Sequence, residues 1–336
     1  MATHFEHQDD ARRQSRRLVL LFSLAVIVTG LCIQGVFTAL WMWVSVDGST
    51  PPLEVHAAIA FVTLLLVLGG WWIETTNMQM PGAAERMAKR MGARDVRPET
   101  SHAEKRLSNV LDEICIAAHM PRPRLMVVPR IESINAFALG WSDDDATVVV
   151  TGGVLDYLTR EEMQGLIAHE CSHLHEGDTH LHMQLAGMVL GLELVYTFGD
   201  DMLALDGRML IGKIVSVIYM LVGWFGWIAG QLLQASVARQ REFLADARAV
   251  QWTRSRDGLG GVLRKAWGQY EQEGTYQYRR EEKWNPAFRH LLLIDGFRKT
   301  SRWFDSHPPL TERLRRLYGR NVQPIVPQRQ PDTPEA

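Results

Sequence analysis

Net charge and cysteine are both scarce in this 336-residue chain. Its 36 Lys and Arg residues nearly balance 38 Asp and Glu residues, and the net charge is −2. We therefore expect no nucleic-acid partner, because no strongly basic field would attract phosphates. The three cysteines form no CxxC pair and no even-numbered framework, so they predict neither a thiolate metal site nor a disulfide scaffold. We expect all three to be small buried hydrophobic residues.

Charge is also missing from a long stretch near the N-terminus. Residues 18–46 contain no charged side chain, and a second apolar run, 55–73, follows after a short polar turn. Each run can cross a bilayer. A cleaved signal peptide is the alternative for the first run, but the run is too long and lacks a small-residue cleavage site. Basic residues flank both outer ends and not the turn, which predicts a transmembrane hairpin over 18–73 with its ends, including residues 1–17, in the cytoplasm.

Two further apolar runs lie in the middle of the chain. Residues 209–233 carry one charge, Lys213, near an end. Only residues 185–198 could return the chain across the membrane, and this piece is short and contains Glu193. Two interpretations remain open: four membrane spans, or two spans and a hydrophobic cytoplasmic hairpin over 181–234.

The remaining segments, 74–180 and 235–320, have mixed polarity and are expected to form the two halves of one catalytic domain. Ser101-x-x-Glu104 and Thr159-x-x-Glu162 resemble capping boxes that open helices, and residues 125–128 and 147–151 are predicted strands. The proline-rich tail, 321–336, is expected to be disordered. The polar stretch 269–284 matches no motif.

The central chemical signal is H-E-C-S-H at residues 169–173. His169 and His173 are four residues apart on a predicted helix, so both rings share one face and can bind one zinc ion. Glu170, one step around the helix, can reach a water at that ion. Asp178, which follows Gly177, is expected to be the N-cap of the next helix, with no chemical role.

A catalytic zinc takes three protein ligands and leaves one position for water. Glu242, in R-Q-R-E-F-L-A-D, is the best candidate for the third ligand, because it begins a helical stretch after the last apolar run. Asp246 lies four residues on, where it could accept a hydrogen bond from a ligand histidine. The alternative for Glu242 is a solvated charge among arginines, and the HExxH partner argues against it.

The chain at this point resembles the HtpX and CAAX-prenyl-protease type of integral-membrane zinc metallopeptidases. Five motifs occur in order: S-I-N-A-F-A-L-G at 133–140, T-G-G-V-L-D at 151–156, E-E-M-Q-G-L-I-A-H-E-C-S-H at 161–173, R-E-F-L-A-D at 241–246 and S-H-P-P-L-T-E-R-L at 306–314. The resemblance spans roughly residues 100–318, and the paired N-terminal spans match the bacterial HtpX pattern.

The resemblance implies Glu242 as the third zinc ligand and Asp246 as its neighbour that supports a ligand histidine. It implies that the segment Asn135–Leu139 is an edge strand beside the cleft that pairs with substrate backbone. His307 is implied to come near the zinc, where it or Asn135 would help to stabilise the oxyanion.

Together these observations predict a mainly α membrane protein with an N-terminal transmembrane hairpin. A zincin-like α+β metalloprotease domain, interrupted by a second hydrophobic hairpin, would follow it. We expect a multi-pass zinc endopeptidase of the inner (plasma) membrane, which cleaves membrane or misfolded proteins at the cytoplasmic face. The resemblance to HtpX implies that this cleavage serves membrane-protein quality control. Its partners would be these protein substrates and the lipid bilayer.

Two alternatives remain. A prenyl-protein processing peptidase ranks lower, because two to four spans are too few to enclose a large membrane chamber. A non-enzymatic scaffold with a structural metal would have no need for a general base such as Glu170.

Overall fold

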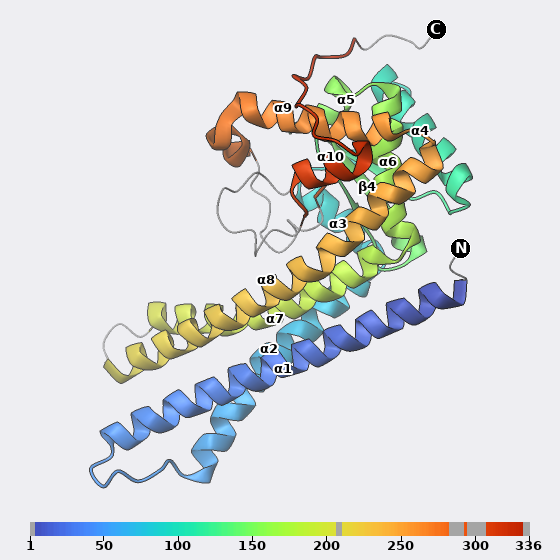
Figure 1. Cartoon of the computed structure of the whole chain (residues 1–336). Helices are drawn as coiled ribbons and strands as arrows, with labels where there is room; N and C mark the ends of the chain where they lie inside the picture. Colours follow the sequence, from blue (N-terminus) through green and yellow to red (C-terminus); the bar gives the residue numbers. More distant parts are fainter. Residues whose placement is uncertain (1–3, 206–209, 282–291, 294–306, 332–336) are drawn as a thin grey trace. The chain divides into compact units, whose positions relative to one another are not determined.

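A computed structural model describes residues 4–205, 210–281, 292–293 and 307–331 of the chain (Figure 1). The chain divides into two compact units. One comprises Met1–Asn77 and Gln184–Gln234, and the other comprises Met78–Met183 and Ala235–Ala336. The residue boundaries that the sequence suggested for the segments stay a prediction.

Long apolar helices make up the first unit. They are α1 (His4–Val44), α2 (Leu53–Gln79), most of α7 (Asp178–Leu205) and the first half of α8 (Leu210–Thr253). Within the described residues, each contains a stretch long and apolar enough to cross a membrane: Leu20–Val44, Leu53–Gln79, Asp178–Ala204 and Gly212–Leu232. The short run 185–198 therefore belongs to a longer helix, because the residues from Asp178 onward continue it. Four candidate spans agree with the first of the two interpretations.

Many large apolar side chains of α1 and α2 are exposed. Trp43, Phe61 and Trp72 are 79%, 67% and 67% exposed. A soluble protein rarely leaves so much contiguous apolar surface in water, whereas lipid solvates it. The composition and the exposure of these helices both indicate a membrane protein.

A four-stranded sheet forms one layer of the second unit. The strands are β1 (Arg94–Asp95), β2 (Arg124–Val128), β3 (Ala136–Leu139) and β4 (Thr147–Thr151), in the order β1-β2-β4-β3. Strand β2 runs parallel to β4, and β3 pairs with β4 antiparallel at the edge. The predicted strands 125–128 and 147–151 are confirmed, and the expected segment Asn135–Leu139 contains the edge strand.

Helices pack around this sheet. They are α3 (Ala83–Arg90), α4 (His102–Ala118), α5 (Gly152–Tyr157), α6 (Arg160–His175), α9 (Arg256–Glu281) and α10 (Leu310–Tyr318), with a short 3-10 turn at Asp143–Asp145. Helix α6 packs against α4, α9 and β3 (Figure 1). Apolar residues such as Leu166 and Ile167 are completely buried, so α6 lies at the centre of this unit.

The two predicted helix starts differ in detail. Thr159 and Glu162 form the full reciprocal capping box at the start of α6. Ser101 caps α4 by accepting from the Glu104 backbone N–H, but the Glu104 carboxylate does not return the bond. It accepts instead from the Arg94 guanidinium and from a nearby backbone N–H. The capping box at Ser101 is therefore only half formed, because the Arg94 guanidinium occupies the Glu104 carboxylate.

The prediction of a disordered tail is wrong for residues up to 331, which bond to two helices of the same unit. Ile325 donates a backbone hydrogen bond to the Arg264 carbonyl in α9, and Gln330 donates one to the Asp156 carbonyl in α5. Arg329 pairs with the Asp156 carboxylate at 2.8 Å. The prolines keep the tail from forming a helix, but the backbone N–H groups of Ile325 and Gln330 and the Arg329 side chain can still bond to neighbouring helices.

Parts of two predicted segments lie outside the described residues. They are 332–336 of the tail and 282–284 of the polar stretch 269–284. The earlier part of that stretch continues α9, which ends at Glu281.

Candidate metal centre

Helix α6 brings its two histidines together as the i, i+4 spacing predicts. The Nε2 atoms of His169 and His173 lie 3.3 Å apart, and their rings stand nearly perpendicular, at 86°. Both residues are buried, with exposures of 0% and 7%. Two ring nitrogens that face each other at this distance, out of contact with water, suit a shared cation.

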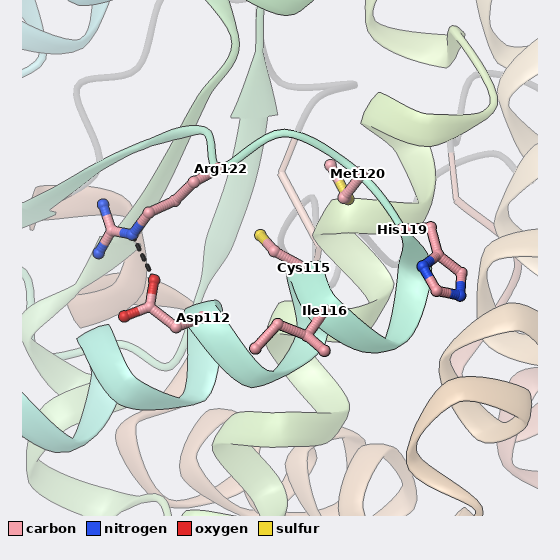
Figure 2. A pocket seen from close by; sticks show the side chains of 6 residues that line it. All are labelled: Asp112, Cys115, Ile116, His119, Met120 and Arg122. Atoms are coloured by element: carbon pink, nitrogen blue, oxygen red, sulfur yellow. Dashed lines mark hydrogen bonds and ion pairs between the residues drawn. The ribbon is translucent and has the colours of Figure 1, made fainter.

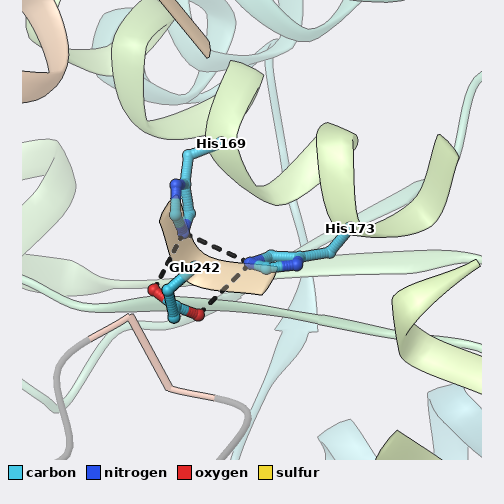
Figure 3. A group of neighbouring side chains, drawn as sticks. All are labelled: His169, His173 and Glu242. Atoms are coloured by element: carbon cyan, nitrogen blue, oxygen red, sulfur yellow. Dashed lines mark hydrogen bonds and ion pairs between the residues drawn. The ribbon is translucent and has the colours of Figure 1, made fainter. Parts of the chain in front are cut away.

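Glu242 approaches the same point from α8. Its Oε2 lies 3.6 Å from His169 Nε2, and its Oε1 lies 3.5 Å from His173 Nε2 (Figure 3). One ligand atom from each of the three residues lies within 4.8 Å of the other two. The structure thus brings together the three residues that the sequence proposed as ligands, and their role as ligands stays a prediction.

The local setting of Glu242 differs from the expectation. The sequence suggested that Glu242 begins a helical stretch, whereas it lies well inside α8. The helix continues without a break from the candidate span Gly212–Leu232. A helix does not have to end where its apolar run ends, because the polar residues that follow also form helices readily.

Buried polar atoms without hydrogen bonds support a cation at this point. Among the described residues, Glu170 Oε1, Glu242 Oε2 and His307 Nε2 are buried and make no hydrogen bond. Such atoms are rare, because burial removes the water that would otherwise bond to them. A metal ion between the two histidines and Glu242 would bind the inward-facing lone pairs, so the residues present fit a metal.

Carboxylates contact the outer nitrogens of both rings. Asp246 Oδ1 lies 3.2 Å from His169 Nδ1, and Asp178 Oδ2 lies 3.0 Å from His173 Nδ1. A carboxylate at Nδ1 keeps the proton there and leaves the Nε2 lone pair for a metal. The contact of Asp246 was expected. The sequence predicted Asp178 only as a helix start and missed its contact with His173. This contact forms because the turn at Gly177, with φ of 73°, brings Asp178 back to the ring.

Two arginines, which the sequence analysis missed, offset the negative charge. Arg313 is completely buried and donates to both oxygens of Asp246, at 2.9 and 2.6 Å. Its Nη1 lies 3.1 Å from Glu242 Oε2. Arg241 pairs with Asp178. Arg313 lies inside the motif S-H-P-P-L-T-E-R-L, and this position was the one sign in the sequence that it belongs to the site.

Burial and nearby charges shift the pKa values of Glu170 and Glu242 in opposite directions. Burial raises the pKa of Glu170 to about 8, and the nearby charge of Glu242 contributes to the rise. Burial also acts to raise the pKa of Glu242, but the charges of His307 and Arg313 outweigh it and hold that pKa well below its usual value. Glu242 is therefore an anion suited to a cation, whereas Glu170 can exchange a proton near neutral pH.

The model of peptidase family M48 matches residues 101–321, which include all the residues of this site. The chain belongs to peptidase family M48. The sequence-based resemblance is thereby confirmed, and this M48 protein is a membrane-bound metalloprotease whose substrates are peptides or proteins. Family membership favours the enzyme over the non-enzymatic scaffold.

Individual relatives agree with this assignment. The chain is 28% identical over 325 residues to a protein named Protease HtpX homolog from Caldanaerobacter subterraneus subsp. tengcongensis, covering 94% of this chain and 97% of the relative. Another of that name, from Dictyoglomus turgidum, is 34% identical over 229 residues, covering 66% and 71%. A third, from Pyrococcus furiosus, is 32% identical over 216 residues, covering 63% and 72%. No solved structure matches the chain.

The two remaining predicted residues of the M48 site lie in different settings. His307 Nδ1 is 3.2 Å from Glu242 Oε1, so the structure brings this ring to the cluster. The Asn135 carboxamide oxygen accepts from the Ala136 backbone N–H, and the Asn135 backbone N–H donates to Thr151 Oγ1. The catalytic roles of His307 and Asn135 stay predictions.

Proposed function

We propose that this M48 metalloprotease is a zinc endopeptidase, with His169, His173 and Glu242 as ligands and Glu170 as the general base. The observation that carries the proposal is the convergence of the three ligand atoms at one buried point. A tetrahedral zinc ion with bonds of about 2.0–2.2 Å needs ligand atoms roughly 3.3–3.6 Å apart. In the structure the two Nε2 atoms lie 3.3 Å apart, and each Glu242 oxygen approaches one ring: Oε1 lies 3.5 Å from His173 Nε2 and Oε2 lies 3.6 Å from His169 Nε2.

Zinc held there would polarise a scissile carbonyl and acidify a water molecule. The protein supplies the proton transfer. Glu170 follows a ligand histidine directly, and burial brings its pKa to about 8. Its carboxylate can therefore take the proton of the attacking water and later deliver it to the leaving amine.

Strand β3 supports a proposal for how substrate is held. The Ala138 backbone N–H donates to the Glu170 carboxylate, so the edge strand lies beside the proposed base. The Ala136 carbonyl on the same strand accepts from the Leu293 backbone N–H, which is the kind of bond that an added strand would make. An extended peptide that pairs with this edge would bring its backbone to Glu170.

Stabilisation of the oxyanion needs a donor close to the metal. We assign this role to His307, because its ring contacts the proposed ligand Glu242. Asn135 is the second candidate, since it directly precedes β3.

We further propose that the enzyme lies in the inner membrane, that its catalytic residues face the cytoplasm, and that it cleaves membrane or misfolded proteins in quality control. Basic residues outside the first hairpin favour this orientation. The relatives named Protease HtpX homolog support the protease activity in this proposal. A membrane-anchored site meets loops of neighbouring membrane proteins before it meets freely diffusing chains.

Cleavage of unfolded casein by the detergent-purified full chain tests the proposal. We expect a chelator to abolish cleavage and zinc to restore it. Glu170→Gln should keep one zinc per chain and lose hydrolysis, whereas Glu242→Ala should lose zinc and hydrolysis together. Glu161→Gln, an exposed acid at the start of α6, is the matched control and should keep both.

Two results would contradict the assignment. Loss of zinc in Glu170→Gln would mean that this residue binds the metal. Full zinc content and full activity in Glu242→Ala would place the third ligand elsewhere.

A further inference from the structure

Two of the three cysteines meet at the packing interface between α4 and α6. Cys115 and Cys171 belong to the same buried apolar cluster, and both are free thiols whose side chains hydrogen-bond to each other. The expectation of small buried hydrophobic residues holds for the burial of this pair, but it does not account for the contact between the sulfur atoms. It is wrong for Cys32, which is exposed on a candidate span, where lipid rather than protein would cover it.

A cavity gives access to one member of this pair. Cys115, 7% exposed, lines a cavity of about 590 Å³ whose other lining residues are Asp112, Ile116, His119, Met120 and Arg122 (Figure 2). Cys171 is completely buried and does not line it. A small reagent can therefore reach Cys115 first, and Cys171 is placed to react with the product.

The surroundings also favour reaction at Cys115. The hydrogen bond with Cys171 and the positive charge of Arg122 lower the pKa of the Cys115 thiol and outweigh burial and the negative charge of Asp112, which both act to raise it. The thiolate is the nucleophilic form of cysteine. Arg122 is held on the cavity lining by Asp112, at 2.5 Å.

We propose that Cys115 and Cys171 are an oxidative modification site, which a hydroperoxide entering the cavity converts to a disulfide. The Cys115 thiol gives up its proton, the thiolate sulfur attacks the terminal peroxide oxygen and the O–O bond breaks. The departing oxygen takes up that proton and leaves as alcohol or water, and Cys115 becomes a sulfenic acid. The Cys171 sulfur then attacks the Cys115 sulfur, and the hydroxyl leaves as water with the Cys171 proton. Two thiols are oxidised by two electrons, and one peroxide is reduced.

The position of Cys171 gives the modification a consequence. It follows Glu170 directly and lies between His169 and His173 on α6. A disulfide requires an S–S distance of about 2.05 Å, so bond formation draws α6 toward α4. This consequence rests on the proposed function, and we expect oxidation to lower casein cleavage and dithiothreitol to restore it. Reversible disulfides in cytosolic enzymes are typically of this redox-sensing kind.

The test uses the full chain in detergent with Cys32→Ser and Glu170→Gln, so that the result does not depend on proteolysis. Hydrogen peroxide is added, free thiols are alkylated, and peptides are mapped by mass spectrometry. We expect a linked Cys115–Cys171 peptide that disappears on reduction. In Cys171→Ala, dimedone should trap a sulfenic acid at Cys115.

Several outcomes would overturn the modification site. They are free alkylation of both thiols after peroxide, oxidation of Met120 alone, and oxidation of Cys115 to sulfinic acid without a cross-link. With Glu170 restored, cleavage should fall as the cross-link forms and recover on reduction. If the protein is fully cross-linked and cleaves casein as fast as before, the proposed effect of the disulfide on α6 is wrong. If the protein cleaves no casein before oxidation, the proposed protease function is wrong instead.

Discussion

Asp246 and Asp178 reach the outer nitrogens of His169 and His173 from different parts of the chain. Asp246 lies one helical turn after Glu242 on α8, and Arg313 fixes its carboxylate from α10. Asp178 stands at the start of α7 and pairs with Arg241. Each histidine is therefore oriented by a carboxylate that is itself held by an arginine.

We predict that Asp178→Asn weakens metal binding by about 10–100-fold, the usual effect of losing such a carboxylate. The amide keeps the size of the side chain but loses the charge that holds the His173 proton on Nδ1. Competition with a chromophoric chelator measures the affinity. Asp143→Asn, an exposed acid in the same unit, is the control. Equal affinities for Asp178→Asn and wild type would show that packing alone orients the ring.

Helices α6 and α9 approach each other closely at Gly165. A Cβ atom there would overlap the backbone of Leu259 and lie 2.6 Å from the Gly258 carbonyl carbon. Backbone atoms cannot rotate away as a side chain can, so one helix would have to move. Gly165 lies one turn before His169, and a displacement of α6 would reach the metal site.

We predict that Gly165→Ala destabilises the protein by about 1–3 kcal/mol, as overpacking usually does, and lowers zinc occupancy. Thermal unfolding in detergent and metal analysis measure the two effects. Gly30→Ala is the matched control, since nothing lies within 4 Å of a Cβ at that helical position. A stable, fully loaded Gly165→Ala protein would mean that the two helices can separate at little cost.

The start of α4 depends on the ionised form of Glu104. Burial acts to raise the pKa of Glu104, but the hydrogen bonds from Arg94 and the Arg97 backbone N–H outweigh it and lower that pKa. A lowered pKa in the folded state means that the stabilisation is present above the unfolded-state pKa of about 4.3. It is lost as the pH falls through the folded-state value.

We therefore predict that Glu104→Gln lowers stability at neutral pH by about 1.5 kcal/mol, the low end for hydrogen bonds to charged groups, because Arg94 is partly exposed. The difference from wild type should shrink as the pH falls below about 4. Urea unfolding at several pH values measures it. A difference that stays constant with pH would assign the effect to packing rather than charge.

At the scale of the whole molecule, the four candidate spans set the topology. We predict that reporter fusions after Asp47 and after Arg94 lie on opposite sides of the membrane, because the first hairpin crosses twice and its basic residues lie outside the turn. A phosphatase that is active only outside the cytoplasm should report the Asp47 fusion alone. Activity from both fusions, or from neither, would contradict the hairpin.

Local patterns in the sequence determined the features that depend on near neighbours. The absence of charge over residues 18–46 requires an apolar environment, and the i, i+4 spacing of His169 and His173 places both rings on one face of a helix. The Thr159 capping box likewise needs only four residues. Glu242 could be proposed because a zinc site needs a third ligand, and the ordered motifs indicated the family.

Only the tertiary structure decided which distant side chains meet. Asp178 faces His173 because a turn follows α6, and Arg313 offsets the charge of two acids because α10 places it beside α8. The tail up to residue 331 is held because its backbone finds acceptors on α9 and α5, and composition cannot show such acceptors. Contacts between distant segments depend on how whole elements pack, whereas periodicity reports only what each element buries.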